Sequence, residues 1–230
     1  MPPSASGSVG LTRRLSARES KPRPAAWDSQ PPREFLLDHL AAQASVVVRC
    51  GLARRIHSDH DGGAVLLQDS IPGVHVIYGA EDWHAVDKRL TGKAKHDMVG
   101  TDGMKVSVGD AFVQIVTMPL SYLFEIRDNG KLLRVAYVGG TAIPFNGSAA
   151  YYDSYIASSK KMAKAAADYG ATALMSNHSE FDDAYFKAHA AAKRKRGEPN
   201  PFDVGADGVA RYFTVVQACT TAVRIRATGQ

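Results

Sequence analysis

Two histidines and two aspartates lie close together in one polar segment that follows the β-branched run Val46 to Val48. They are His57, Asp59, His60 and Asp61, and Gly62 and Gly63 come directly after them. Imidazole nitrogens and carboxylate oxygens are the usual protein ligands of zinc and related metals. Because a strand end can aim such side chains at one point, the His-x-Asp-His spacing predicts a metal site. The spacing leaves open the alternative that these histidines only cap the next helix or face solvent.

A further histidine, His178, follows a short apolar stretch and precedes a predicted helix. A single histidine in such a loop is more often a hydrogen-bonded structural residue than a ligand. It becomes a ligand candidate only in combination with the first segment. Four other histidines show no ligand spacing: His75, His84, His96 and His189.

The composition is that of a globular protein, with 230 residues, 45% hydrophobic and 22% charged. No apolar run approaches the roughly 20 residues that cross a bilayer, and no apolar stretch follows the N-terminal charges, so we expect a cytoplasmic protein without membrane contact. The net charge of +5 is scattered, and nucleic acid is therefore not an expected partner. The basic run at 193–196 is expected to be a solvated helix end. Cys50 and Cys219 have apolar neighbours and are expected to be buried thiols.

Residues 1–32 are rich in Ser, Pro and Arg without an apolar period, so we expect disorder there, with an organelle transit peptide as the alternative. One domain is expected from residue 33 to residue 230. Strands are expected at 46–48, 74–78, 105–108, 112–116, 120–126, 132–138 and 173–175, and helices at 64–68, 81–89, 149–169, 181–193 and 207–222. The hairpin signal at 128–130 predicts antiparallel pairing in the middle section. This mixed α/β (α+β) order implies sheets covered by helices, with the chemistry on loops at strand ends. Tyr78 and Trp83 are expected to pack in the core or at the edge of the sandwich.

The segment from His57 to Ala64 resembles the latter part of the His-x-His-x-Asp-His-x-Gly-Gly motif of the metallo-β-lactamase superfamily. Further matches follow in the family's order, at Ala80 to Trp83, Thr101 to Gly103, Val108 to Asp110, Gly139 to Ala142 and Leu174 to His178. The resemblance covers about residues 45 to 222. It implies an αββα sandwich whose metals lie at one edge between the two sheets.

The resemblance also implies ligands and a reaction. Asp59, His60 and His178 match the positions that bind the family's second metal, and His57 matches one of three that bind the first. One Zn²⁺ ion is therefore expected rather than two. Asp59 is also expected to take part in catalysis, by orienting or relaying the proton of the metal-bound water. The implied function is zinc-dependent hydrolysis of an ester, thioester or amide in a small-molecule substrate, through hydroxide bound to the metal.

Several departures from the family pattern lie in the same region. Arg55 stands where the motif has its first histidine, and a guanidinium cannot ligate zinc. The stretch from Val116 to Ser121 is shorter than the family's second metal loop and contains no histidine. Gly140-Thr141 occupies the expected position of the bridging aspartate. These departures favour the alternative that the chain is a catalytically impaired or inactive member, a pseudoenzyme or an incomplete gene product, that retains the fold.

The section before the motif is short, polar and Pro-rich, where family members have sheet-forming sequence. We therefore expect the domain to be incomplete at its N-terminal side, with strands of one sheet missing. Uncovered strand edges attract pairing partners. An oligomer that covers an exposed sheet edge is the expected consequence.

Overall fold

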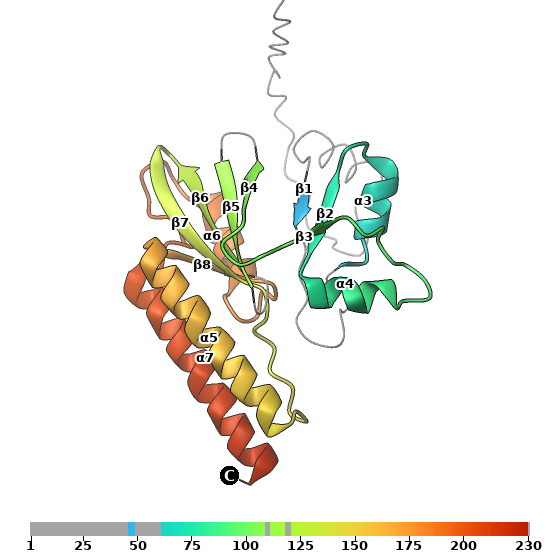
Figure 1. Ribbon diagram of the computed structural model, residues 1–230. Coiled ribbons are helices and arrows are strands. Elements are labelled where there is room, and N and C mark those ends of the chain that lie inside the picture. The colour runs from blue at the N-terminus through green and yellow to red at the C-terminus, as the bar shows by residue number, and fades with distance from the viewer. Residues whose placement is uncertain (1–45, 49–60, 109–110, 118–120, 230) are drawn as a thin grey trace, which may run out of the picture.

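Two β-sheets lie side by side in the computed structural model, which describes residues 46–48, 61–108, 111–117 and 121–229 (Figure 1). The first sheet has the order β1 (Val46–Val48), β2 (His75–Tyr78) and β3 (Met98–Val99), all parallel. The second has the order β4 (Lys105–Val108), β5 (Ala111–Val116), β6 (Ser121–Asp128), β7 (Lys131–Val138) and β8 (Ala173–Ser176). Strands β4 to β7 pair antiparallel, as predicted, and β8 joins β7 in parallel.

Helices cover the outer face of each sheet (Figure 1). Beside the first sheet lie α3 (Ala64–Ser70) and α4 (Ala80–Asp87). Beside the second lie α5 (Ala149–Tyr169) and α7 (Gly205–Thr228), while α6 (Ala184–Lys193) follows β8. The layer order of helix, sheet, sheet and helix confirms the predicted αββα sandwich.

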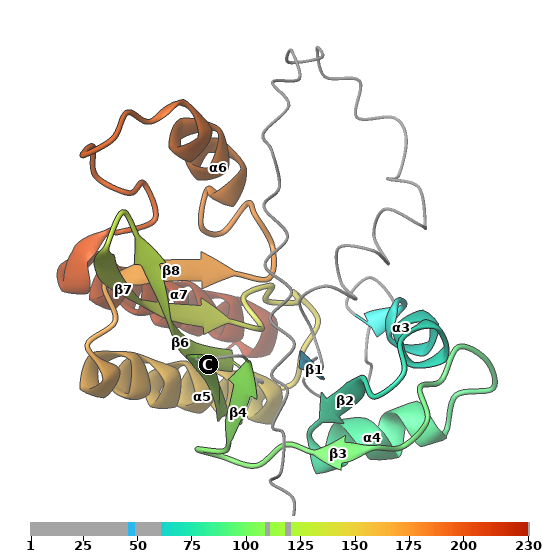
Figure 2. The same cartoon turned by 90° about the horizontal axis from the view of Figure 1, so that it is seen from above.

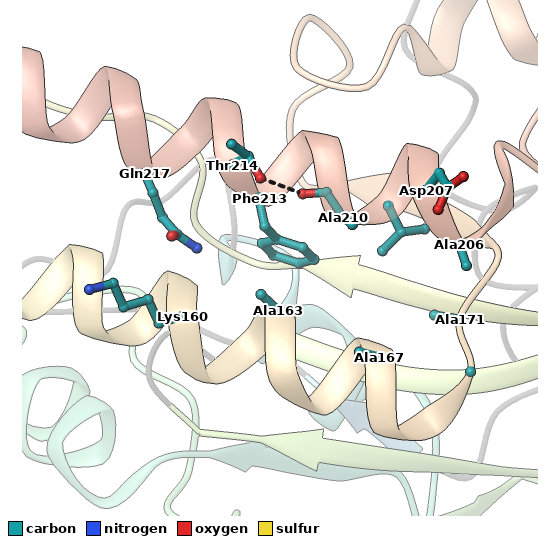
Figure 3. Close-up of a pocket in the computed structure, with 12 residues that line it drawn as sticks. Lys160, Ala163, Ala167, Ala171, Ala206, Asp207, Ala210, Phe213, Thr214 and Gln217 are labelled. Carbon is teal, nitrogen blue, oxygen red and sulfur yellow. Dashed lines mark hydrogen bonds between the residues drawn. The ribbon is translucent and has the colours of Figure 1, made fainter.

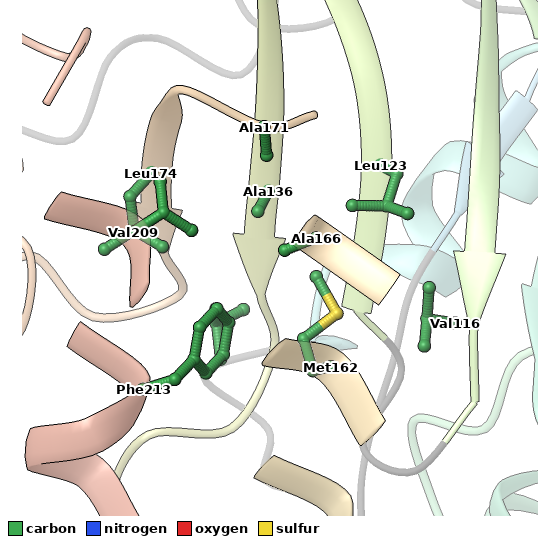
Figure 4. Close-up of a cluster of buried hydrophobic side chains, with 10 residues drawn as sticks. Val116, Leu123, Ala136, Met162, Ala166, Ala171, Leu174, Val209 and Phe213 are labelled. Atoms are coloured by element: carbon green, nitrogen blue, oxygen red, sulfur yellow. The ribbon is translucent and has the colours of Figure 1, made fainter. Parts of the chain in front are cut away.

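Three apolar clusters fill the three interfaces between these layers. The first, between α3, α4 and the first sheet, consists of Ala64, Val76, Tyr78, Trp83, Val86 and Ala94. The second, between the sheets, contains Ile77, Val106 and Ile115. The third lies between the second sheet, α5 and α7 (Figure 4); its members are Val116, Leu123, Ala136, Val138, Met162, Ala166, Ala171, Leu174, Val209 and Phe213. Alternate side chains of β2 enter different clusters because successive residues of a strand face opposite sides.

Gly100, directly after β3, is packed against residues of both sheets. A Cβ atom there would lie 3.1 Å from Cγ2 of Ile77 and 3.2 Å from Cδ1 of Ile115. These distances are tighter than ordinary van der Waals contact. Glycine therefore permits the close contact between β2 and β5 across the middle of the sandwich.

Local signals explain the elements that the sequence predicted well. The β6–β7 hairpin turns at Asn129 and Gly130, whose φ angles of 50° and 85° suit a tight hairpin. Helix α5 has the predicted bounds, because Ser148 Oγ accepts a hydrogen bond from the Tyr151 backbone and Gly170 ends the helix with φ 72°. Tyr78 and Trp83 are buried, as expected.

Other expectations need correction. Helix α6 begins three residues later than predicted, α7 extends beyond both predicted ends, and β3 was missed because two residues carry no period. Cys219 is exposed, not buried. Arg194 is not solvated: its guanidinium donates to both carboxylate oxygens of Asp128, at 2.6 and 2.5 Å. Cys50 and the predicted disorder at 1–32 lie outside the described residues. No helix within the described part of the chain is long and apolar enough to cross a membrane.

Candidate metal centre

Strands β7 and β8 end at the same edge of the second sheet because they run parallel. Figure 2 shows both arrowheads on the side that faces the first sheet. Two loops, 139–148 and 177–183, leave from this edge. They are tied to it by backbone groups: Asn177 N donates to Val138 O at 3.1 Å, and Gly139 N donates to Ser121 Oγ at 3.2 Å. Loops at such an edge are where the sequence predicted the chemistry.

His178 lies in the second of these loops, two residues beyond β8. Its side chain is 27% exposed, so the imidazole is half-buried at the sheet edge. The ring stacks on Phe181 with centroids 6.1 Å apart, and Nδ1 lies 3.7 Å from a carboxylate oxygen of Glu180. The His178 backbone N–H donates to Ser176 Oγ at 3.4 Å. The structure therefore holds this predicted ligand at a strand end with part of its ring open to solvent.

Asp182 closes the turn that carries His178, and the sequence analysis did not identify it. One carboxylate oxygen accepts from Ser176 N at 2.7 Å, and the other accepts from Ala184 N at 3.0 Å. The side chain is buried, with 5% of the residue exposed. An aspartate two residues before a helix start was the available signal, because Asp side chains commonly bond the backbone N–H two residues on.

Behind the same edge, three hydroxyl groups form a continuous chain. Thr141 Oγ1 lies 3.0 Å from Ser176 Oγ and 2.8 Å from the hydroxyl oxygen of Tyr212. Ser176 Oγ in turn donates to Asn177 Oδ1 at 3.4 Å. Burial raises the pKa of Tyr212, so this hydroxyl keeps its proton at neutral pH. Thr141 belongs to the Gly140-Thr141 pair that the sequence analysis matched to the bridging aspartate, and its hydroxyl is engaged inside the protein.

Two tyrosines of α5 hold the other loop of the edge. The Tyr155 hydroxyl donates to Gly140 O at 2.5 Å, and the Tyr152 hydroxyl donates to Pro144 O at 2.8 Å. The Tyr152 oxygen also accepts from Gly147 N at 2.9 Å. Burial is the main cause that raises the pKa of Tyr155 far above its usual value of 10. Both loops of the edge are thus fixed by side chains from the helical layer behind them.

On the first-sheet side, Asp61 is the described member of the polar segment. Its Oδ2 accepts from Arg89 Nη1 at 2.7 Å and from the Tyr78 hydroxyl at 3.1 Å. The Asp61 side chain is 1% exposed and the Arg89 side chain 21%. Because its Oδ2 is engaged with a cation, Asp61 anchors the end of the segment, while its buried Oδ1 has no hydrogen-bond partner among the described residues.

The remaining predicted site residues lie outside the described residues, namely Arg55, His57, Asp59 and His60. Their distance from His178 therefore stays a prediction. Across residues 46–48, 61–108, 111–117 and 121–229, no three His, Cys, Asp or Glu side chains gather to hold a metal ion. The described residues alone therefore do not supply a three-ligand metal site around His178.

A separate hollow of about 560 Å³ runs between α5 and α7 on the outer face of the molecule (Figure 3). Small side chains line most of it, with Phe213 facing the hollow between the two helices. Lys160 and Asp207 lie at opposite ends, so their charges do not converge. The hollow belongs to the helical layer and not to the strand-end edge.

Comparisons with known proteins identify the fold. The sequence matches no protein-family model, and a comparison with curated proteins gives no match. Among solved structures, the chain is similar to BJP-1, a subclass B3 metallo-β-lactamase of Bradyrhizobium japonicum, with 20% identity, 85% of this chain and 80% of that chain covered, and a TM-score of 0.65. The native FEZ-1 metallo-β-lactamase from Legionella gormanii is 16% identical, with 76% of this chain and 74% of that chain covered and a TM-score of 0.62. The SMB-1 metallo-β-lactamase in a complex with mercaptoacetic acid is 15% identical, with 84% of this chain and 81% of that chain covered and a TM-score of 0.61.

The class defined by the fold and the site is an αββα sandwich with a polar strand-end edge between its sheets. The chain has the metallo-β-lactamase fold.

Proposed function

We propose that this chain is a zinc-dependent hydrolase that acts on an ester, thioester or amide bond of a small molecule. The observation that carries the proposal is the half-buried imidazole of His178, held at the edge of β8 in a chain with the metallo-β-lactamase fold. The three neighbours described above are all named as metallo-β-lactamases. A small-molecule substrate is part of the same proposal.

One zinc ion would be held by Asp59, His60 and His178, with His57 close by. Three protein ligands leave a coordination position for water. When bound, zinc supplies Lewis-acid chemistry and lowers the pKa of water to about 7. Asp59 would orient or relay the proton of the attacking water. The residues Tyr152, Tyr155 and Asp182 keep the two loops of the edge in place, as the hydrogen bonds above show.

The donor set favours one ion over two. Thr141 replaces a bridging carboxylate with a hydroxyl that is already bonded to Ser176 and Tyr212. Arg55 brings a permanent positive charge to the motif in place of a neutral imidazole. Both substitutions remove ligands that a second ion would need.

The same Thr141 observation supports a second candidate, a catalytically impaired chain that retains the fold. In that case the 57–60 segment and His178 would not bind zinc tightly enough to activate water. The two candidates differ in metal content, which can be measured before any substrate is known.

The test measures zinc by elemental analysis after metal removal and reloading, together with hydrolysis of p-nitrophenyl acetate and a simple thioester. We expect about one equivalent of zinc per chain, and activity that a chelator removes and zinc restores. His60→Ala and His178→Ala should lower both metal content and activity. His84→Ala is the matched control, because His84 is exposed on α4 and outside the proposed centre. Binding below about a tenth of an equivalent, unchanged by His60→Ala, would end the zinc proposal and favour the impaired chain.

A further inference from the structure

The turn that carries His178 is held from behind by residues of three elements. Asp182 closes the turn itself, Thr141 lies in the loop after β7, and Tyr212 lies on α7. We propose that Asp182 and the hydroxyl chain of Tyr212, Thr141 and Ser176 are positioning residues that fix His178 and thereby set the zinc affinity of the edge. The statement on zinc affinity rests on the proposed function, whereas the statement on position does not.

The hydroxyl chain has a single consistent direction. Each hydroxyl carries one hydrogen and can donate once. Because Ser176 donates to Asn177 Oδ1, the bond between Ser176 and Thr141 is donated by Thr141, and the bond between Thr141 and Tyr212 is donated by Tyr212. Tyr212 is therefore the first donor of a polarised chain that ends at the residue before His178. Hydrogen bonds aligned in this way strengthen one another.

Ser176 is the point where the chain and the turn meet. Its Oγ accepts from the His178 N–H and from Thr141, while its own backbone N–H donates to Asp182. Loss of the Tyr212 hydroxyl removes the bond that Thr141 Oγ1 accepts, so the Thr141 hydroxyl is held less firmly against Ser176. The effect on His178 then passes through Ser176, over bonds of 2.8, 3.0 and 3.4 Å.

Asp182 contributes a different constraint. Its two carboxylate oxygens accept from the backbone at the start and at the end of the turn, so the turn cannot open without breaking a charge-assisted bond. Both oxygens are bonded to the backbone in this buried group, so Asp182 holds the turn and does not ligate metal. Thr141 and Tyr212 are 71 residues apart in the sequence, and the hydrogen bond between them ties α7 directly to the loop after β7.

The test compares Tyr212→Phe with Tyr169→Phe as a matched control. Both rings pack against the third apolar cluster, but the buried Tyr169 hydroxyl has no hydrogen-bond partner among the described residues. In the metal-free protein, amide hydrogen exchange at Asn177 and His178 should become about fivefold faster in Tyr212→Phe and should stay unchanged in the control. The zinc dissociation constant should rise about tenfold in Tyr212→Phe alone, because supporting partners of metal ligands have effects of this size.

Two further variants distinguish loss of the hydrogen bond from misfolding of the chain. Thr141→Val removes the hydroxyl and keeps the shape, whereas Thr141→Ser restores a hydroxyl and should recover wild-type exchange. Equal exchange in Tyr212→Phe and Tyr169→Phe would overturn the positioning role. Faster exchange with an unchanged zinc constant would overturn its link to the metal. If the wild-type chain binds no zinc, the proposed function fails, and exchange in the metal-free protein still decides the positioning role.

Discussion

The two halves of the sandwich contain buried polar clusters of different kinds. On the first-sheet side, a carboxylate faces a guanidinium: Asp61 is bonded to Arg89 and to the Tyr78 hydroxyl. On the second-sheet side, Asp182 accepts from backbone groups, and a chain of neutral hydroxyls joins Ser176, Thr141 and Tyr212. An ion pair binds strongly only while both charges are present, but a chain of hydroxyls loses one modest bond at a time. A single substitution in the cluster of the first half should therefore lower the free energy of unfolding more than a single substitution in the cluster of the second half.

The largest expected effect follows removal of the cation from the first cluster. Arg89→Met keeps most of the side-chain stem and leaves the Asp61 carboxylate buried without its charge partner. We expect a loss of about 3 kcal/mol in the free energy of unfolding, measured by urea denaturation. Arg211→Met, an exposed arginine on α7, should change stability by less than about 0.5 kcal/mol. The double variant Asp61→Asn with Arg89→Met should recover part of the loss, and a single-variant loss as small as that of the control would refute the contrast between the halves.

An intermediate effect is expected from a hydroxyl of the second half. Tyr155→Phe removes the bond to Gly140 O and should cost about 1 kcal/mol in the free energy of unfolding at neutral pH. Burial raises the pKa of Tyr155 in the folded chain above the unfolded value of 10. A raised pKa gives stability that is present below pH 10 and is lost as pH rises above it. The wild-type chain should therefore lose stability above pH 10 more steeply than Tyr155→Phe; identical slopes in the two chains would contradict this account.

The sequence predicted the elements that depend on neighbouring residues. The hairpin at Asn129-Gly130 and the ends of α5 at Ser148 and Gly170 follow from local backbone and capping preferences. The strands of the second sheet follow from short runs rich in β-branched and aromatic residues. Strand β3 could not be predicted, because its two residues acquire strand geometry only from pairing with β2.

The candidate site was predicted less completely, for a physical reason. His178 was identified because its type and its place after a strand are visible in the sequence. The residues that hold it were not, since Thr141 and Ser176 are 35 residues apart and Thr141 and Tyr212 are 71 apart. A threonine or tyrosine gives no sign of such a bond until the fold brings the partners together. The same limit explains the error at Arg194, whose partner Asp128 is 66 residues away.

The smallest expected effect sharpens the comparison, because it concerns an ion pair away from the candidate edge. Arg194 bonds Asp128 at the β6–β7 turn, where the two side chains are 13% and 20% exposed. The hydrogen bond from Arg194 is the main cause that holds the pKa of Asp128 below its usual value of 3.8. A depressed pKa gives stability that is present above pH 3.8 and is lost as pH falls through the folded-state pKa.

Arg194→Gln should therefore flatten the acid limb of the stability curve below about pH 4 and leave stability at neutral pH less affected than Arg89→Met does. Acid titration of unfolding for both variants makes the measurement, with Lys193→Gln as the neighbouring control. An Arg194→Gln loss at neutral pH as large as that of Arg89→Met would show that charge pairing, and not burial of the carboxylate, sets the sensitivity of the first half.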